Sequence, residues 1–86
     1  DLLDTLSTNK SSDLQVIEIP IPKNSGASGH RLENVLKHAE GVSVLALNSS
    51  NGVSQVHPTG REVLYAGDSL VVMGTRNQLH SLQKIV

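Results

Sequence analysis

The stretch that decides the fold is residues 65–74, YAGDSLVVMG. Gly67 and Asp68 in this stretch predict a tight turn before a strand. Glycine takes positive φ angles without steric cost, and a short carboxylate accepts hydrogen bonds from nearby backbone amides. The run from Leu70 to Met73 then carries apolar side chains on both faces. This pattern predicts a central β-strand that is covered on both sides, with the rest of the chain packed around it.

Composition limits the function classes that are open to this chain. Its 86 residues suffice for one domain with a modest core. With 7 basic and 8 acidic residues, the chain has no excess of positive charge that would attract nucleic acid or an anionic membrane. No nucleic-acid partner is therefore expected. The absence of cysteine excludes a disulfide scaffold and cysteine-ligated zinc. No apolar run approaches the roughly 20 residues of a membrane helix. The first residue is Asp1, which suggests a fragment of a longer protein.

The N-terminal part divides into a linker and the start of a domain. Residues 1–13 are expected to be a linker or the tail of an upstream element, with Leu2, Leu3 and Leu6 on one side of a short helix, and 14–86 form the domain. Residues 14–21 alternate between apolar and other side chains, which is typical of a half-buried strand with its isoleucines turned inward. Pro20 and Pro22 cannot donate to a ladder, so this strand is expected at a sheet edge.

A helix is predicted next. Leu32, Val35, Leu36 and Ala39 form one apolar stripe, Ser28 is the candidate N-cap, and Gly41 fits the position after the helix. On this reading, Lys37 and His38 lie in the last helical turn, where cations suit the helix dipole.

The remaining elements complete an α+β domain. Residues 42–47 and 53–57 are predicted strands joined by a hairpin loop that contains Asn51-Gly52. Thr75 and Gln78 form a capping-box pattern at the start of a final helix. The predicted order is therefore β-α-β-β-β-α: a small, mostly antiparallel sheet with both helices on one face.

No catalytic or metal-binding constellation is visible, so the chain is not expected to be an enzyme. The four histidines lie at spacings that do not suit one ion, and no pair of acids suggests acid–base chemistry. The glycine-rich stretch 25–29 precedes the first helix and invites two interpretations, an anion site or a turn with an N-cap. It lacks the Gly-Lys-Ser/Thr of a P-loop, and the turn is favoured.

Several motifs occur here in the order of one known family. They are the Ile-Glu-Ile-Pro-Ile-Pro run at 17–22, Gly29-x-x-Leu32, the Gly-Val-x-Val-Leu-Ala-Leu run at 41–47, Pro58, and Leu-x-x-Gly-Asp-x-Leu-Val-Val-x-Gly at 64–74. The chain resembles a TrkA-C domain, the C-terminal lobe of an RCK (regulator of potassium conductance) unit. The resemblance covers 14–86, and its most specific part is the stretch at 64–74.

The resemblance implies a regulatory domain on the cytoplasmic side of a membrane transport protein. It implies a ligand-sensing homodimer attached to a transporter or channel, with cation or potassium transport favoured. Some members bind cyclic di-AMP in the dimer cleft, through a basic residue near the end of the first helix and a polar residue before the second strand. Lys37 or His38, and Ser43, hold those places here, where the family's usual residues are Arg and Asn.

No other cofactor is implied. The dimer is predicted to form through the face that carries both the first helix and the edge strand at 14–21, because an edge strand with an apolar outward side needs cover and a two-fold axis sets equal patches against each other. The expected ligand-binding residues around the shared cleft are Ile21, Pro22, Lys37, His38 and Ser43. The alternative function is pure dimerisation or assembly of a chloride channel or another permease, with no small ligand.

Overall fold

The computed structural model describes residues 13–86 as one four-stranded sheet with two helices. The predicted linker at 1–13 and the leucines of its proposed helix therefore lie outside the described residues, apart from Asp13. The elements are β1 (Leu14–Pro20), α2 (Leu32–Leu36), β2 (Ser43–Asn48), β3 (Ser54–Val56), β4 (Ser69–Thr75) and α3 (Arg76–Ile85). The predicted α+β class and the order β-α-β-β-β-α are confirmed.

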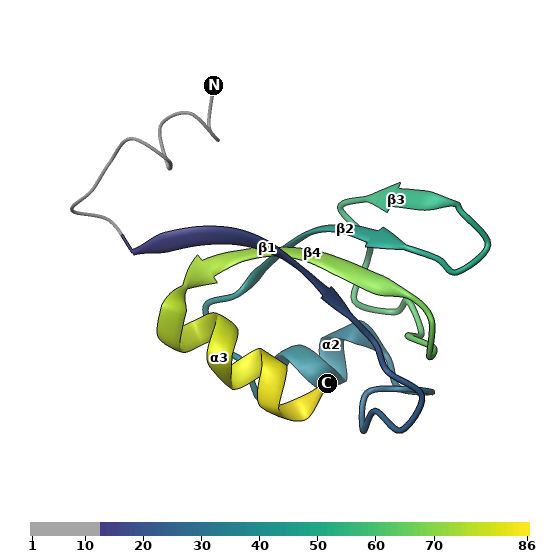
Figure 1. Cartoon of the computed structure of the whole chain (residues 1–86), viewed down its shortest axis with the longest axis horizontal. Helices are drawn as coiled ribbons and strands as arrows, with labels where there is room; N and C mark the ends of the chain where they lie inside the picture. The colour runs from purple at the N-terminus through teal and green to yellow at the C-terminus, as the bar shows by residue number, and fades with distance from the viewer. Residues whose placement is uncertain (1–12) are drawn as a thin grey trace.

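The sheet is antiparallel and has the strand order β1-β4-β2-β3 (Figure 1). β4, which carries the run from Leu70 to Met73, pairs with β1 on one side and with β2 on the other, so its central place is confirmed. β1 forms an edge of the described sheet, as its prolines predict. Both helices lie on the same face of the sheet (Figure 1).

The prediction that β4 is covered on both faces is wrong. Burial alternates along the strand: Leu70, Val72 and Gly74 are buried, whereas Val71 and Met73 are only partly buried. Both helices pack on the first of these faces, and no described element packs on the second. We call the second the open face. An apolar run alone does not reveal this, because a partly buried valine and a fully buried one look the same in the sequence.

The core lies between the sheet and the helices. Ile19 and Ile21 of the first strand segment are 4% and 2% exposed, and Ile17 packs against the same cluster, which confirms the predicted inward direction of the isoleucines. The seven largest fully buried side chains are all aliphatic: Ile21, Leu32, Leu64, Leu70, Val72, Leu79 and Leu82.

Helix α2 is shorter than predicted, and its N-cap differs. The cap is Arg31, which makes no side-chain cap bond, so the prediction of Ser28 is wrong. The first helical amides instead donate to carbonyls of a later loop: Leu32 N–H to Glu62 O at 2.8 Å and Glu33 N–H to Gly60 O at 2.9 Å. The helix ends at Leu36, so Lys37 is its C-cap and His38 lies beyond the last turn. Backbone carbonyls thus replace the expected local cap.

The turn before β4 is held by the carboxylate of Asp68, which is 6% exposed. Its two oxygens accept hydrogen bonds from Ser50 N–H at 3.1 Å and from Tyr65 N–H at 3.0 Å. Gly67 has a φ of 94°, so the predicted left-handed glycine is confirmed. The Asp68 carboxylate therefore joins the β2–β3 hairpin loop to the turn that starts the central strand.

The predicted capping box of α3 is confirmed. Thr75 N–H donates to Gln78 Oε1 at 2.9 Å, and Gln78 N–H donates to Thr75 Oγ1 at 3.2 Å. Leu79 and Leu82 are the buried residues of this helix. The reciprocal bonds satisfy two backbone donors at the point where β4 passes directly into α3.

Candidate functional site

A cavity of about 190 Å³ lies where α2, the loop before it and the end of α3 meet. Its floor is apolar, because Ala27 and Val35 are nearly fully buried there. Its polar lining comes from His30, Asn34 and His38, which are all exposed. A cavity with an apolar floor and a few polar groups at its rim suits a small planar molecule better than a bare ion.

A wider hollow of about 420 Å³ adjoins the other end of α2. His38 lines both spaces, and we call the two together the helix groove. The hollow contains one basic and one acidic side chain, Lys37 and Glu40, and polar groups from α3. Its full lining is Lys37, His38, Ala39, Glu40, Asn77, Gln78 and Ser81.

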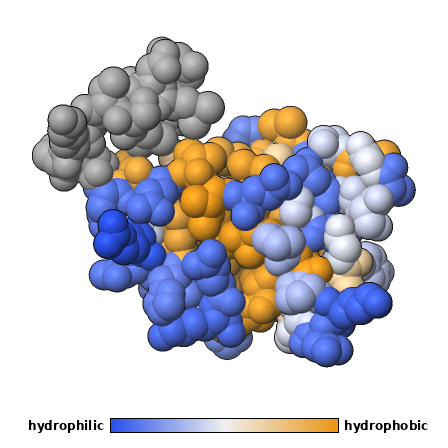
Figure 2. Space-filling model, in the orientation of Figure 1, coloured by the Kyte–Doolittle hydropathy of each residue, from blue (hydrophilic) through white to orange (hydrophobic). Residues whose placement is uncertain are grey.

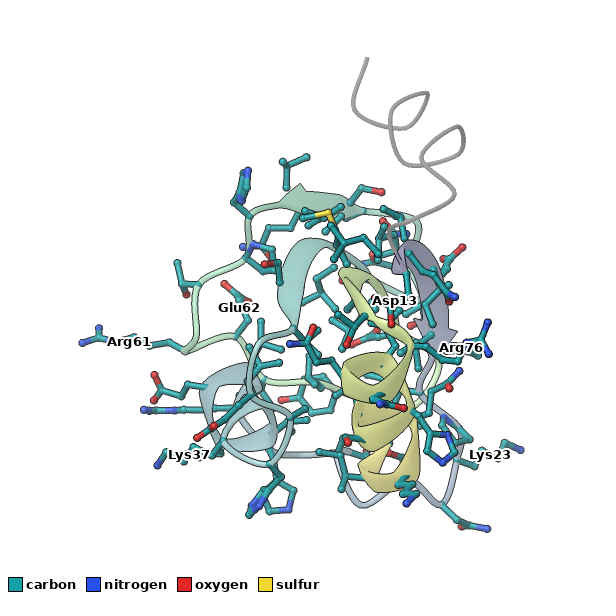
Figure 3. The ribbon with its side chains drawn as sticks, turned by 90° about the vertical axis from the view of Figure 1, so that its left-hand side faces the viewer. Asp13, Lys23, Lys37, Arg61, Glu62 and Arg76 are labelled. Atoms are coloured by element: carbon teal, nitrogen blue, oxygen red, sulfur yellow. The ribbon has the colours of Figure 1, made fainter. Side chains whose placement is uncertain are left out.

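One copy of the chain does not bring the five predicted ligand-binding residues together. Lys37 and His38 lie in the helix groove, and Ser43 is exposed at the start of β2. Ile21 belongs to the core, and the neighbouring Pro22 is exposed. Figure 3 shows Lys23, which follows Pro22, on the opposite side of the molecule from Lys37. A cleft between two copies stays a prediction.

Of the groove residues, the sequence-based prediction named only Lys37 and His38; the polar residues that it missed include His30, Asn34, Asn77 and Ser81. A signal for Asn34 was available, because it lies four residues before His38 and, like His38, opposite the apolar stripe of the predicted helix. Asn77 and Ser81 show the same spacing on α3. The pairing of the two polar helix faces arises from tertiary packing and has no local signal.

A second polar cluster lies on the open face of the sheet. Ser69 Oγ–H donates to Glu18 Oε2 at 2.6 Å, and Asn48 Nδ2–H donates to the same oxygen at 3.3 Å. The hydrogen bond from Ser69, with a smaller contribution from Asn48, lowers the pKa of the Glu18 carboxyl. The Glu18 side chain is therefore turned across the sheet, toward β4 and β2.

Metal and phosphate chemistry find little support in the part of the chain that the structure describes. Residues 13–86 contain no group of three or more histidine or acidic side chains that could hold a metal ion. In the stretch 25–29, Ser25 Oγ accepts a hydrogen bond from Ala27 N–H at 3.0 Å, as in a local turn. The amides of Leu32 and Glu33, to which an anion would bind, already donate to carbonyls. Among the described helices, none is long and apolar enough to cross a membrane.

The sequence matches the TrkA-C domain over residues 16–86. The chain belongs to the TrkA-C family. The match covers most of the chain, and it confirms the resemblance seen in the motifs between Ile17 and Gly74. No curated protein matches the chain in a sequence search.

Solved structures of TrkA-C-like domains share the fold at low sequence identity. The RCK_C domain dimer of S. agalactiae BusR, in complex with c-di-AMP, matches with a TM-score of 0.73 and 20% identity, over 86% of this chain and 91% of that one. BusR in complex with its busAB-promotor DNA gives 0.73 and 22%, over 98% of this chain and 41% of that one. The GsuK channel bound to NAD gives 0.69 and 21%, over 98% of this chain and 16% of that one. The chain thus spans less than half of the two longer proteins.

The prediction that excludes nucleic-acid partners is wrong. BusR, which contains a domain of this fold, has been seen in complex with promoter DNA in two structures. The argument from net charge fails because it weighs one domain alone, whereas a longer protein can bind DNA through other parts of its chain.

Proposed function

We propose that this TrkA-C domain is a non-catalytic, ligand-sensing regulatory domain of an ion transporter or channel, on the cytoplasmic side of the membrane. The observation that carries the proposal is the family match over 16–86. The occurrence of the fold in the GsuK channel supports the transport setting, and potassium or another cation is the favoured ion. Two copies of the domain act together, as in the BusR dimer.

The proposed ligand is a small anionic molecule with a planar ring, and a cyclic dinucleotide is the first candidate. The BusR domain binds c-di-AMP, and GsuK binds NAD, so both relatives take ligands that contain adenine and phosphate. In the helix groove, Lys37 offers a charge for one phosphate, and the cavity beside His38 offers an apolar floor for a ring. Lysine holds phosphate as a point charge and lacks the fork of arginine, so weaker binding is expected than with an arginine there.

The test is a thermal-shift measurement with cyclic di-AMP, NAD and inorganic phosphate as separate probes. A ligand at about 100 times its dissociation constant adds roughly 2.7 kcal/mol to folding stability, which raises the melting temperature by about 10 °C or more in a domain of this size. The double variant Lys37→Ala/His38→Ala should lose the shift. His80→Ala is the matched control, because His80 is exposed on α3 and does not line the groove. No shift with any probe would refute ligand sensing by the isolated domain.

The second candidate is an assembly domain that binds no small molecule. It is favoured by the near balance of charge in the wider hollow, where Lys37 is accompanied by Glu40. Residues 13–86 also contain no buried side-chain donor or acceptor that lacks a partner. An unchanged melting temperature with all three probes, in a protein that still associates, would select this function.

A further inference from the structure

The outer edge of β1 carries backbone groups that no described strand uses. In the sheet order, β1 pairs only with β4. Ile21 N–H donates to Asp68 O at 2.8 Å and Ile21 O accepts from Gly67 N–H at 2.9 Å, so the polar groups of Ile21 point toward the β4 side. Backbone groups alternate in direction along a strand. Those of Ile19 and Ile17 therefore also face β4, and those of Val16 and Glu18 face outward.

Pro20 supports this assignment independently. It lies two residues after Glu18 and four after Val16, so its backbone nitrogen also faces the outer edge. The hydrogen that proline lacks there is not needed for a bond to β4. Edge strands are commonly protected from association by a charged side chain or a proline. Here proline protects only the last residue of β1, and the outward amides of Val16 and Glu18 remain.

The one charged side chain of β1 does not guard this edge. The Glu18 carboxylate is held over the sheet by Ser69 and Asn48, at 2.6 and 3.3 Å, and so points away from the outer edge. Val16 and Ile17 beside it are only partly buried. Figure 2, which views the molecule from the β1 side, shows apolar residues gathered in the middle of the view with hydrophilic residues at its left and lower borders. The edge thus combines available hydrogen-bonding groups with apolar flanks.

We infer that β1 is a strand-pairing surface for a second copy of this chain. The pairing is antiparallel about a two-fold axis beside Ile17, which makes the strand its own partner. Val16 and the partner's Glu18 then exchange N–H···O bonds in both directions, and the symmetric pair does the same, so the two sheets become continuous. The two Ile17 side chains face each other at the axis. This inference names the surface for the pairing in the proposed function and does not involve the helix groove.

The test is amide hydrogen exchange of the whole chain by NMR at several protein concentrations, with sedimentation equilibrium on the same samples. The amides of Val16 and Glu18 should exchange roughly tenfold more slowly once few chains remain monomeric, whereas that of Ile19 is protected at all concentrations. A protein that dimerises while the amides of Val16 and Glu18 stay unprotected would overturn the inference. So would a monomer at all concentrations, or protection that does not depend on concentration, since the chain itself would then cover the edge.

A pair of matched variants tests the same surface. Val16→Lys places a lysine on the pairing edge and should raise the dimer dissociation constant by about tenfold or more. Val56→Lys makes the same change on β3, at the other edge of the sheet, where valine is 72% exposed, and should change it by less than about threefold. Equal effects of the two variants would refute the assignment to β1. A ligand-induced thermal shift that persists in Val16→Lys would leave the proposed function intact even if the pairing surface proves wrong.

Discussion

Removal of the Asp68 carboxylate should strongly destabilise the domain. In Asp68→Ala, the amides of Ser50 and Tyr65 lose the oxygens to which they now donate at 3.1 and 3.0 Å. Hydrogen bonds to a charged group contribute roughly 1.5–3 kcal/mol each, and water will reach part of this site, so we expect a loss of about 3 kcal/mol. A domain of this size has a total stability of roughly 5–10 kcal/mol, so the variant should still fold but melt about 12–20 °C lower.

The assay is urea denaturation followed by far-ultraviolet circular dichroism, with thermal melts on the same samples. Asp68→Asn keeps one carbonyl oxygen, so it should lose about half as much stability as Asp68→Ala. Asp13→Ala is the control for the loss of one negative charge, because Asp13 is exposed, and it should change stability by less than about 0.5 kcal/mol. If Asp68→Ala loses less than about 1 kcal/mol, the carboxylate does not hold the two loops together and the reasoning fails.

Three further predictions concern the open face, the capping box and the core. Because hydrogen bonds lower the folded-state pKa of Glu18, its ionised carboxylate stabilises the fold at pH values above its ordinary pKa, and this stabilisation is lost as pH falls through the lower folded-state value. The urea midpoints of wild type and Glu18→Gln should therefore differ at pH 7 and converge in acid. Gly41→Ala should cost about 1–2 kcal/mol more folding stability than Gly52→Ala in urea denaturation. Both glycines have positive φ, but only at Gly41 would a Cβ collide with the side chain of Gln78, which belongs to the α3 capping box. Equal costs for the two variants would contradict this. Val72→Asp should abolish the cooperative melt, because it buries an unpaired charge, whereas Val71→Asp on the open face should retain it; a cooperative Val72→Asp variant would refute the placement of that residue.

The features that local sequence specifies were predictable. Thr75 and Gln78 lie three residues apart and form their capping box without help from elsewhere. Gly67 and Asp68 form the expected turn for the same reason. Pro20 and Pro22 predicted the edge position of β1, because a residue without an N–H cannot donate to a neighbouring strand, and this can be read from the strand's own sequence. Motif order then identified the family, which periodicity alone does not.

The features that depend on distant partners were not predictable. The cap of α2 comes from carbonyls of Gly60 and Glu62, so no nearby serine or aspartate marks it. The apolar run at Leu70–Met73 indicates burial on both faces, but whether an element covers the second face is decided by the whole fold. The helix groove likewise arises where α2 meets α3, and the sequence of neither helix alone predicts it. Among the predicted ligand-binding residues, only Lys37 and His38 lie in that groove.

The dependence of α2 on residues 60–64 has a consequence for the order in which the domain folds. A five-residue helix has too few internal hydrogen bonds to be stable alone, because the entropy lost in forming the first turn exceeds the free energy gained from its hydrogen bonds. Its first amides gain acceptors only after the chain has been made as far as Glu62, and the bridge between Arg31 and Val63 closes the same loop. The hairpin of β2 and β3 lies between these segments in sequence, so α2 becomes stable only when about thirty intervening residues are already arranged. We therefore expect the wall of the groove that carries His38 to form late in folding, and to be the first part released when the loop at 60–64 is displaced.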